Sequence, residues 1–399
     1  MIQQQTFSTA AGSMVNAPLF GHARRGDFLL ADGIAHLNHG SFGAVPRGVL
    51  EAVQEWQRRI EADPDTFFRR DLFALLHGAA DRIAGFLGGR GGDWAFVENA
   101  TSGLNAVIAS LRLEPGDELL CLSQVYGAVG NALRYHAERA GARIVTVAVP
   151  VPFGDPAPLL DRLKAALGAR TRLALFDHIV SGSAAVLPIA DMAALCRKRG
   201  VPVAIDGAHA PGQIALDVPA LGVQWYVGNL HKWAFAAKGT AVLWCAPERQ
   251  AALHPTVISH DLGKGFPAEF AWTGTRDPSA WLAAPVALDY LAALDADAVR
   301  AHNAALARAA AALLIDAWGT EAAAAPEFRA AMVSVRLPLS AGADRDAAHR
   351  LIDRLRRDHA IAVNVAALDR ALWVRVSAQI YNELDDYRRL AALGPRLLA

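Results

Sequence analysis

Two residues in this sequence have types and positions that suit chemistry in a buried site, and the first is Asp206. It ends the apolar run 201–205 and is followed by glycine and alanine. This pattern predicts a buried strand that carries a carboxylate to its carboxyl end, the edge at which open α/β sheets bind ligands. Because a buried carboxylate is costly without a cation, we expect Asp206 to face one, such as a protonated pyridine nitrogen.

The second residue is Lys232, which follows the apolar run 223–230 and lies between His231 and Trp233. A lysine with little water around it loses its proton more readily, and only the neutral amine attacks an aldehyde. Taken alone, Lys232 could be a solvated lysine at a strand end, and Asp206 could be a turn residue or a helix cap. Taken together, they predict that Lys232 holds pyridoxal phosphate as a Schiff base while Asp206 faces the ring nitrogen.

A turn of small polar residues offers a binding site for the phosphate group of such a cofactor. The strand predicted at 94–98 leads into Asn-Ala-Thr-Ser-Gly at 99–103, and a helical pattern follows. Free backbone amides, the hydroxyls of Thr101 and Ser102, and the helix dipole would attract an anion there. Tyr126, at the start of a later helix, could stack on a flat ring, although a core or capping role fits it equally well.

The elements that must position these residues alternate along the chain. Strands predicted at 118–122, 143–149, 172–176 and 201–205 alternate with helices at 126–140, 157–168 and 189–199. Such alternation indicates an α/β fold with a mainly parallel sheet and helices on both faces. A single helix is expected from Ser279 to about Leu294. We divide the chain into an N-terminal arm (1–33), a large cofactor-binding domain (34–285) and a small C-terminal α+β domain (286–399).

Composition narrows the class of protein. The 399 residues contain thirty-nine basic and thirty-nine acidic side chains without a basic cluster, so nucleic acid is not an expected partner. The three cysteines are widely separated and lack metal-ligand spacing, which favours a reducing compartment without disulfides or a metal site. Neither a leader peptide nor a membrane-spanning run is recognisable, so we expect a cytoplasmic protein that does not bind membranes.

Several short motifs occur in an order that has a known parallel. They are Leu37-Asn38-His39-Gly40-Ser41, Asn99-Ala100-Thr101-Ser102-Gly103, Asp206-Gly207-Ala208-His209, Asn229-Leu230-His231-Lys232-Trp233, Trp272-Thr273-Gly274-Thr275-Arg276, and Arg375-Val376-Ser377 with Tyr381-Asn382. From about residue 34 onward the chain resembles the class V aminotransferase family, and within it the isopenicillin N epimerase-like branch. The resemblance implies a fold type I pyridoxal-phosphate enzyme, with a mainly parallel seven-stranded sheet and a small C-terminal α+β domain.

The resemblance also implies a role for each motif residue. Lys232 would form the Schiff base, Asp206 would pair with the ring nitrogen, and His209 would lie near the ring oxygen. Arg375 would hold the substrate α-carboxylate in a bidentate pair, with Asn38 and His39 nearby. Thr275 would reach the phosphate of a neighbouring subunit, which implies a homodimer. The remaining cofactor contacts would come from Thr101, Ser102, Asn229 and His231 at the phosphate and from Tyr126 stacked on the ring.

The reaction remains open among several outcomes. Lys232, once released, would take the α-proton of an amino-acid substrate, and we expect an epimerase or racemase, with a β-eliminating C–S lyase or an aminotransferase as alternatives. A binding or regulatory protein on the same fold is disfavoured because it has no need of Lys232 and Asp206. Sulfur transfer through a protein persulfide is also disfavoured, since Cys245, in an apolar strand, is the one cysteine after Lys232. An epimerase needs an acid on the opposite face, for which Tyr126, His39 and His178 are the candidates.

Overall fold

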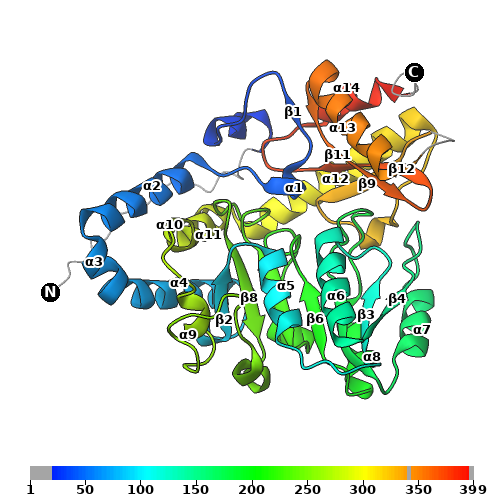
Figure 1. The fold of residues 1–399 in the computed structure, drawn as a ribbon. Coiled ribbons are helices and arrows are strands. Elements are labelled where there is room, and N and C mark those ends of the chain that lie inside the picture. The colour runs from blue at the N-terminus through cyan, green and yellow to red at the C-terminus, as the bar shows by residue number, and fades with distance from the viewer. Residues whose placement is uncertain (1–19, 339–342, 395–399) are drawn as a thin grey trace.

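The computed structural model describes residues 20–338 and 343–394, and its largest element is a seven-stranded sheet (Figure 1). The strands lie in the order β2-β8-β7-β6-β5-β3-β4. Only β8 among them runs antiparallel to its neighbours. This confirms the predicted α/β fold with a mainly parallel sheet. The strands are β2 (Trp94–Val97), β3 (Glu118–Leu122), β4 (Arg143–Val147), β5 (Thr171–Asp177), β6 (Val203–Asp206), β7 (Trp225–Asn229) and β8 (Ala241–Cys245).

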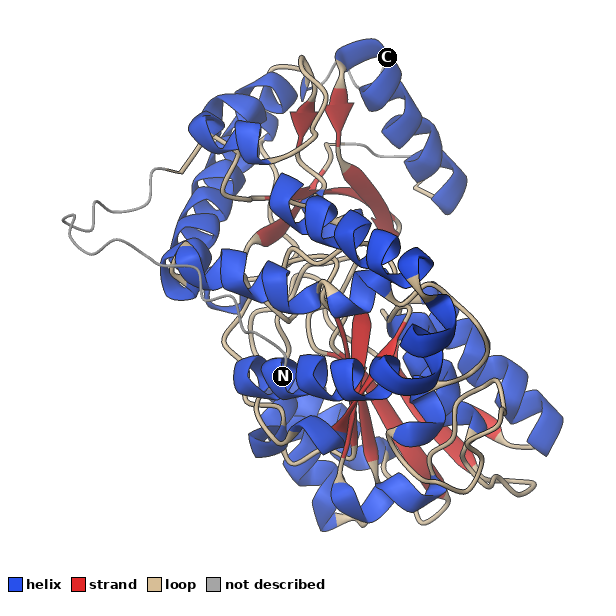
Figure 2. Ribbon diagram, turned by 90° about the vertical axis from the view of Figure 1, so that its left-hand side faces the viewer, coloured by secondary structure: helices blue, strands red, loops and turns tan. Residues whose placement is uncertain are grey.

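Helices cover both faces of this sheet because successive strand residues point to opposite sides and both sides are apolar. One buried cluster joins one face to α5 (Ala100–Ala109) and α6 (Gly127–Ala140). A second cluster joins the other face to α4 (Leu72–Leu87), α7 (Ala157–Ala166), α8 (Ile189–Lys198) and α11 (Ala284–Ala293). Figure 2 shows the strands of the large sheet with helices on either side.

The chain outside this sheet begins with short helices and a long one. These are α1 (His39–Phe42), α2 (Arg47–Ala62) and α3 (Pro64–Thr66), and α2 packs against α11 and α10 (Ser279–Leu282). A further short helix, α9 (Ala268–Ala271), lies beside β2. The single helix expected from Ser279 to Leu294 is wrong, because α10 and α11 are separate helices there. Pro285 lies in the first turn of α11, where its missing N–H and fixed φ favour a helix start.

The C-terminal part forms a smaller α+β unit with its own core. Its three-stranded antiparallel sheet has the order β11-β12-β9. Helices α12, α13 and α14 share one buried cluster with these strands. The elements are α12 (Ala296–Trp318), β9 (Met332–Arg336), α13 (Arg345–His359), β10 (Ile361–Ala362), β11 (Asn364–Leu368), β12 (Ala371–Ser377) and α14 (Leu384–Ala391).

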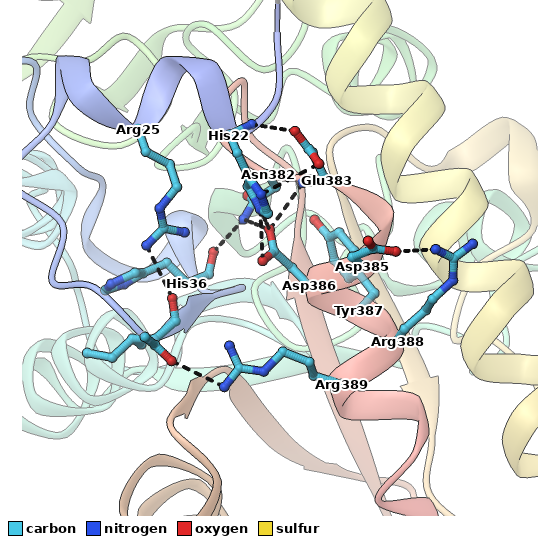
Figure 3. A network of polar contacts seen from close by, with 12 residues as sticks. His22, Arg25, His36, Asn382, Glu383, Asp385, Asp386, Tyr387, Arg388 and Arg389 are labelled. Carbon is cyan, nitrogen blue, oxygen red and sulfur yellow. Dashed lines mark hydrogen bonds and ion pairs between the residues drawn. The ribbon is translucent and has the colours of Figure 1, made fainter.

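The segment before α1 is attached to this smaller unit. Strand β1 (Ala35–His36) pairs in parallel with β10, and Leu37 lies in the core of the smaller unit. Figure 3 shows the polar contacts that add to this pairing. His22 reaches both carboxylate oxygens of Asp386 at 3.2 Å, and Asn382 donates to the backbone oxygen of His36 at 3.1 Å. The domain boundaries at residues 33 and 285 stay predictions.

The described residues include no helix with both the length and the apolar character that spanning a membrane requires. The expected cytoplasmic location stays a prediction.

Candidate active site

A cavity of about 570 Å³ lies at the carboxyl ends of the central strands. The residues that follow β2, β5, β6 and β7 line it, together with Ser41 and Phe42 from α1. Eight predicted site residues meet there: Thr101, Ser102, Tyr126, Asp206, His209, Asn229, His231 and Lys232. Four others, Asn38, His39, Thr275 and Arg375, are not among the lining residues.

Lys232 is prepared for chemistry by its surroundings. It lies in the turn after β7, which ends at Asn229, and its Nζ lies 3.2 Å from His209 Nε2. Burial and the positive charge of Arg375 lower the pKa of Lys232 to about 7. A substantial fraction of this lysine is therefore the neutral amine near neutral pH, which is the form that attacks an aldehyde or accepts a proton.

Asp206 is the last residue of β6, as predicted, and is 4% exposed. Its Oδ1 accepts the backbone N–H of Ala208 at 3.0 Å. Burial raises the pKa of Asp206, while the Ala208 hydrogen bond and the Lys232 charge lower it. The carboxylate thus lies at a strand end with few protein donors, and a ligand cation would stabilise its ionised form.

His209 has one ring nitrogen free for a ligand. Burial and the charges of Lys232 and Arg375 lower the pKa of His209 well below its ordinary value, so the ring is neutral. When Lys232 donates to Nε2, the ring proton must lie on Nδ1. That buried Nδ1 has no partner among the described residues. In that tautomer His209 has an unpaired Nδ1–H donor.

The turn before α5 is held in place by two asparagines. Asn99 caps the helix, accepting the Ser102 N–H at 2.9 Å, and Asn229 Oδ1 accepts the Ala100 N–H at 2.8 Å. These contacts use each Oδ1, whereas the Asn229 amide group remains available as a donor. The helix N-terminus and the hydroxyls of Thr101 and Ser102 thus form a site that suits an anion.

His231 lies near the same anion site, with its Nδ1 at 3.1 Å from the backbone oxygen of Thr240. Since that oxygen can only accept, Nδ1 carries the proton and Nε2 is an acceptor in the neutral ring. Burial lowers the pKa of His231 to about 4, and the charges of Lys232 and Lys238 contribute to this decrease. His231 would therefore have to take up a proton, favoured by a nearby dianion, in order to donate to a phosphate.

Tyr126 lines the cavity directly before α6 and is 48% exposed. Its half-exposed ring is compatible with the predicted stacking on a flat ligand. No contact within the described residues tests that role.

Arg375 of β12 is 1% exposed and already bound by protein groups. Its NH1 donates to Ser181 at 2.8 Å (backbone oxygen) and 3.1 Å (Oγ), and its NH2 donates to Asn38 Oδ1 at 3.1 Å and Ser41 Oγ at 2.8 Å. Ser41 and Ser181 line the cavity, so these residues separate the guanidinium from it. A substrate carboxylate would reach Arg375 only by displacing or joining these hydroxyls.

The two histidines considered as opposite-face acids have structural partners instead. The ring of His39 lies 2.9 Å from Tyr381 Oη and 2.9 Å from the backbone oxygen of Lys232. His178 Nδ1 lies 3.0 Å from Tyr226 Oη. Burial lowers the pKa of His39 to about 3 and that of His178 to about 4, so both are neutral. Neither lines the cavity.

Thr275 lies on an exposed loop outside the cavity. The neighbouring Arg276 forms an ion pair of 2.8 Å with Glu98 at the cavity wall. The predicted contact of Thr275 with a second subunit stays a prediction.

Sequence reasoning missed several lining residues, among them Asp177, Ser181, Ser41 and Glu98. For Asp177 a signal existed, since it follows the apolar run 173–176 in the same way that Asp206 follows its own run. Ser41 was quoted within a motif, but its contact with Arg375 joins residues far apart in sequence. No local pattern reveals such a contact.

The cavity fits pyridoxal phosphate in its chemistry. The buried Asp206 would meet the ring nitrogen, the free Nδ1–H of His209 would meet a ring oxygen, and the start of α5 would meet the phosphate. Lys232 would meet the aldehyde. A volume of about 570 Å³ also lies within the usual range of roughly 300 to 1,000 Å³ for small-molecule sites.

Two curated relatives of known name match most of this chain. A putative L-cysteine desulfhydrase from Oryza sativa subsp. japonica is 34% identical over 92% of this chain and 84% of its own length. An isopenicillin N epimerase from Streptomyces clavuligerus is 35% identical over 92% of this chain and 96% of its own.

Solved structures support the fold. The cystine C–S lyase C-DES in complex with cysteine persulfide has a TM-score of 0.78 at 21% identity, covering 92% of this chain and 97% of that one. A glycine-bound variant of C-DES, with a TM-score of 0.78 at 20% identity over 94% and 98% of the two chains, carries pyridoxal phosphate. The model of the family described as Aminotransferase class-V matches residues 43–390. The chain therefore belongs to the class V aminotransferase family, is a fold type I enzyme, and has pyridoxal phosphate as its cofactor.

Proposed function

We propose that this enzyme is a C–S lyase that eliminates the β-sulfur of cysteine or of a cysteine conjugate. The observation that carries the proposal is that Lys232, with a pKa near 7, lines the cavity while His39 and His178 do not. β-Elimination needs one base at the α-carbon and a leaving group at the β-carbon. Epimerisation needs, in addition, an acid on the opposite face.

The residues of the chain would share the work as follows. Pyridoxal phosphate supplies an electron sink for the bond that breaks at the substrate α-carbon. Neutral Lys232 accepts the α-proton, and Asp206 keeps the ring nitrogen protonated. The guanidinium of Arg375 donates hydrogen bonds to Ser41 and Ser181, and its positive charge favours a bound α-carboxylate. The hydroxyls of Thr101 and Ser102, with Asn229 and His231, would bind the phosphate, and Tyr126 would cover the ring.

The relatives support elimination slightly better than epimerisation, which reverses the order of preference that the sequence motifs alone gave. Curated relatives named L-cysteine desulfhydrase are 31 to 34% identical over about nine tenths of this chain. The buried cysteines agree with a lyase that releases its sulfur directly. Burial raises the pKa of the Cys245 thiol to about 12, so a reactive thiolate is not available from it.

Epimerisation is the second candidate, because Tyr126 lines the cavity. A phenol in the cavity could act as the opposite-face acid. The isopenicillin N epimerase at 35% identity supports this candidate.

Proton NMR in heavy water tests the two candidates together. The cofactor-loaded enzyme is incubated with L-cysteine, cysteine conjugates and a panel of other amino acids, and the α-proton and any keto acid are followed. Elimination predicts pyruvate with ammonia from L-cysteine or a conjugate, and neither from the Lys232→Ala control. Loss of the α-proton signal from an intact amino acid, without pyruvate from any sulfur substrate, would overturn the lyase proposal in favour of the epimerase.

A further inference from the structure

Asp177 is a second carboxyl group in the cavity to which the cofactor contacts above assign no role. It is the last residue of β5, and in the parallel ladder it pairs with Asp206, the last residue of β6. Paired residues of neighbouring strands, which lie about 4.8 Å apart, point their side chains to the same face of a sheet. Both residues line the cavity, and they are 3% and 4% exposed.

The two carboxyl groups have different partners. Asp206 accepts the Ala208 N–H, and the positive charge of Lys232 favours its ionised form. The backbone N–H groups of Tyr126 and of Asp177 itself favour the ionised form of Asp177, but its buried Oδ2 has no partner among the described residues. Among the described residues, Asp177 therefore has neither a cation nor a side-chain donor that would stabilise a negative charge.

The surrounding elements supply no such cation. His178, which follows Asp177, is neutral and bonded to Tyr226 of β7, and His209 after β6 is neutral as well. Lys232 interacts with Asp206, and Arg375 lies against Ser181 and α1. Burial and the charge of Asp206 raise the pKa of Asp177 well above its usual value. Two buried carboxylates at this spacing cannot both ionise without a large cost.

We propose that Asp177 is a positioning residue that stays protonated beside the ionised Asp206, so that the carboxyl pair presents a single negative charge to the ring of the cofactor. The unpartnered Oδ2 carries the proton. The backbone N–H of Tyr126, the residue that would cover the ring, is one of the groups that act on this carboxyl group. A neutral neighbour leaves Asp206 less basic than an ionised one would, which limits how tightly the ring nitrogen is held. The proposal requires only that the cavity binds pyridoxal phosphate. It is the same whether the reaction is elimination or epimerisation.

Infrared spectroscopy tests the protonation state directly. A protonated buried carboxyl group has a carbonyl stretching band apart from the amide and carboxylate bands, and heavy water shifts it to lower frequency. The cofactor-loaded wild-type enzyme at neutral pH should show this band, and both Asp177→Asn and Asp177→Ser should lose it. Absence of the band from the wild-type enzyme, or its persistence in both variants, would overturn the proposal. The wild-type spectrum decides the matter even if one variant fails to fold.

Binding of pyridoxal phosphate gives a second readout. Asp177→Asn, which keeps a side-chain oxygen as an acceptor and removes no charge from the pair, should leave the dissociation constant and the pH profile of the cofactor absorbance as in the wild type. The matched change Asp206→Asn removes the charge, and the dissociation constant should rise by at least about tenfold. If Asp177→Asn shifts the absorbance profile as Asp206→Asn does, Asp177 is ionised and the proposal is wrong.

Discussion

At the scale of single residues, the site depends on how burial changes the chemistry of Lys232. Its amine has a pKa of about 7, because a buried ammonium group loses hydration and Arg375 repels it. The neutral fraction therefore rises as pH increases through about 7 and is nearly complete one to two units higher. An ordinary lysine, with a pKa of about 10.4, would reach that state only at a pH above this value.

This leads to a prediction for capture of the cofactor. The rate at which apoenzyme forms a Schiff base with pyridoxal phosphate, followed by stopped-flow absorbance, should increase up to about pH 8 and then level off. Lys232→Ala should show no such phase. A rate that keeps rising by about tenfold per pH unit beyond pH 9 would mean that Lys232 has an ordinary pKa.

The site residues show what sequence reasoning can locate. Asp206 and Lys232 were recognisable because each follows an apolar run, and a parallel sheet brings strand ends to one edge. Asp177 carried the same local signal and was overlooked, because the preceding run was read only as a strand. The hydrogen bonds of Arg375 to Ser41 and Ser181 come from three distant segments, which no local pattern joins.

At the scale of elements, the loop after β7 is packed tightly against α1. A Cβ placed on Gly43 would lie 1.9 Å from the backbone oxygen of His231, and Gly43 also has a φ of 71°. Gly43→Ala should therefore displace the loop that carries Lys232 and weaken binding of pyridoxal phosphate severely, by well over tenfold in a titration. Gly48→Ala is the control, since a Cβ there meets nothing within 4 Å in α2 and should slightly increase stability. Equal cofactor affinity in the two variants would show that the close approach does not matter.

Asp386 is the residue that ties the segment before α1 to α14. It is buried, and it accepts hydrogen bonds from the Glu383 N–H at 3.1 Å, Asn382 Nδ2 at 3.2 Å and the His22 ring (Figure 3). Asp386→Ala should lower the free energy of unfolding by about 2 to 4 kcal/mol, because a helix cap is lost and buried donors are left unpaired. The exposed neighbour Asp385 is the matched control, and its change to alanine should cost less than about 1 kcal/mol. Urea unfolding measures both, and similar losses would contradict the role given to Asp386.

Element boundaries were predictable where one physical signal dominated. The strands of the large sheet are short apolar runs between helical patterns, so their positions could be predicted closely. The break between α10 and α11 was missed because the apolar pattern continues across Pro285. The pairing of β1 with β10 joins residues more than three hundred positions apart, which periodicity does not reveal.

At the scale of the whole molecule, a homodimer is our proposal, and an exposed loop suggests where it forms. Between residues 254 and 276 the chain exposes Val257, Ile258 and Leu262 and then Thr275. Grouped exposed apolar side chains are typical of interaction surfaces. Ile258→Asp combined with Leu262→Asp should shift the protein from dimer to monomer in sedimentation velocity and weaken cofactor binding. Leu29→Asp, another exposed apolar position, should change neither. A wild-type monomer would contradict the proposal.

The overall architecture followed from alternation of elements and from family resemblance. Alternating strands and helices predict a mainly parallel sheet between two layers of helices, and this is the arrangement observed. The choice between elimination and epimerisation depends instead on which groups line a cavity. Those groups come from several distant segments, so they could not be identified from the sequence pattern.

The central claim is that Lys232 is the residue that holds pyridoxal phosphate, and its natural competitor is Lys238. Lys238 is exposed, but desolvation lowers its pKa as well, and its Nζ donates to the backbone oxygen of Gly43 at 3.1 Å. The most direct measurement is reduction of the cofactor-loaded enzyme with borohydride, followed by peptide mapping by mass spectrometry. We expect one phosphopyridoxyl group on the peptide that contains Lys232, none on Lys238, and no label in Lys232→Ala. Label on Lys238 or another lysine in the wild-type enzyme would contradict the account of this site.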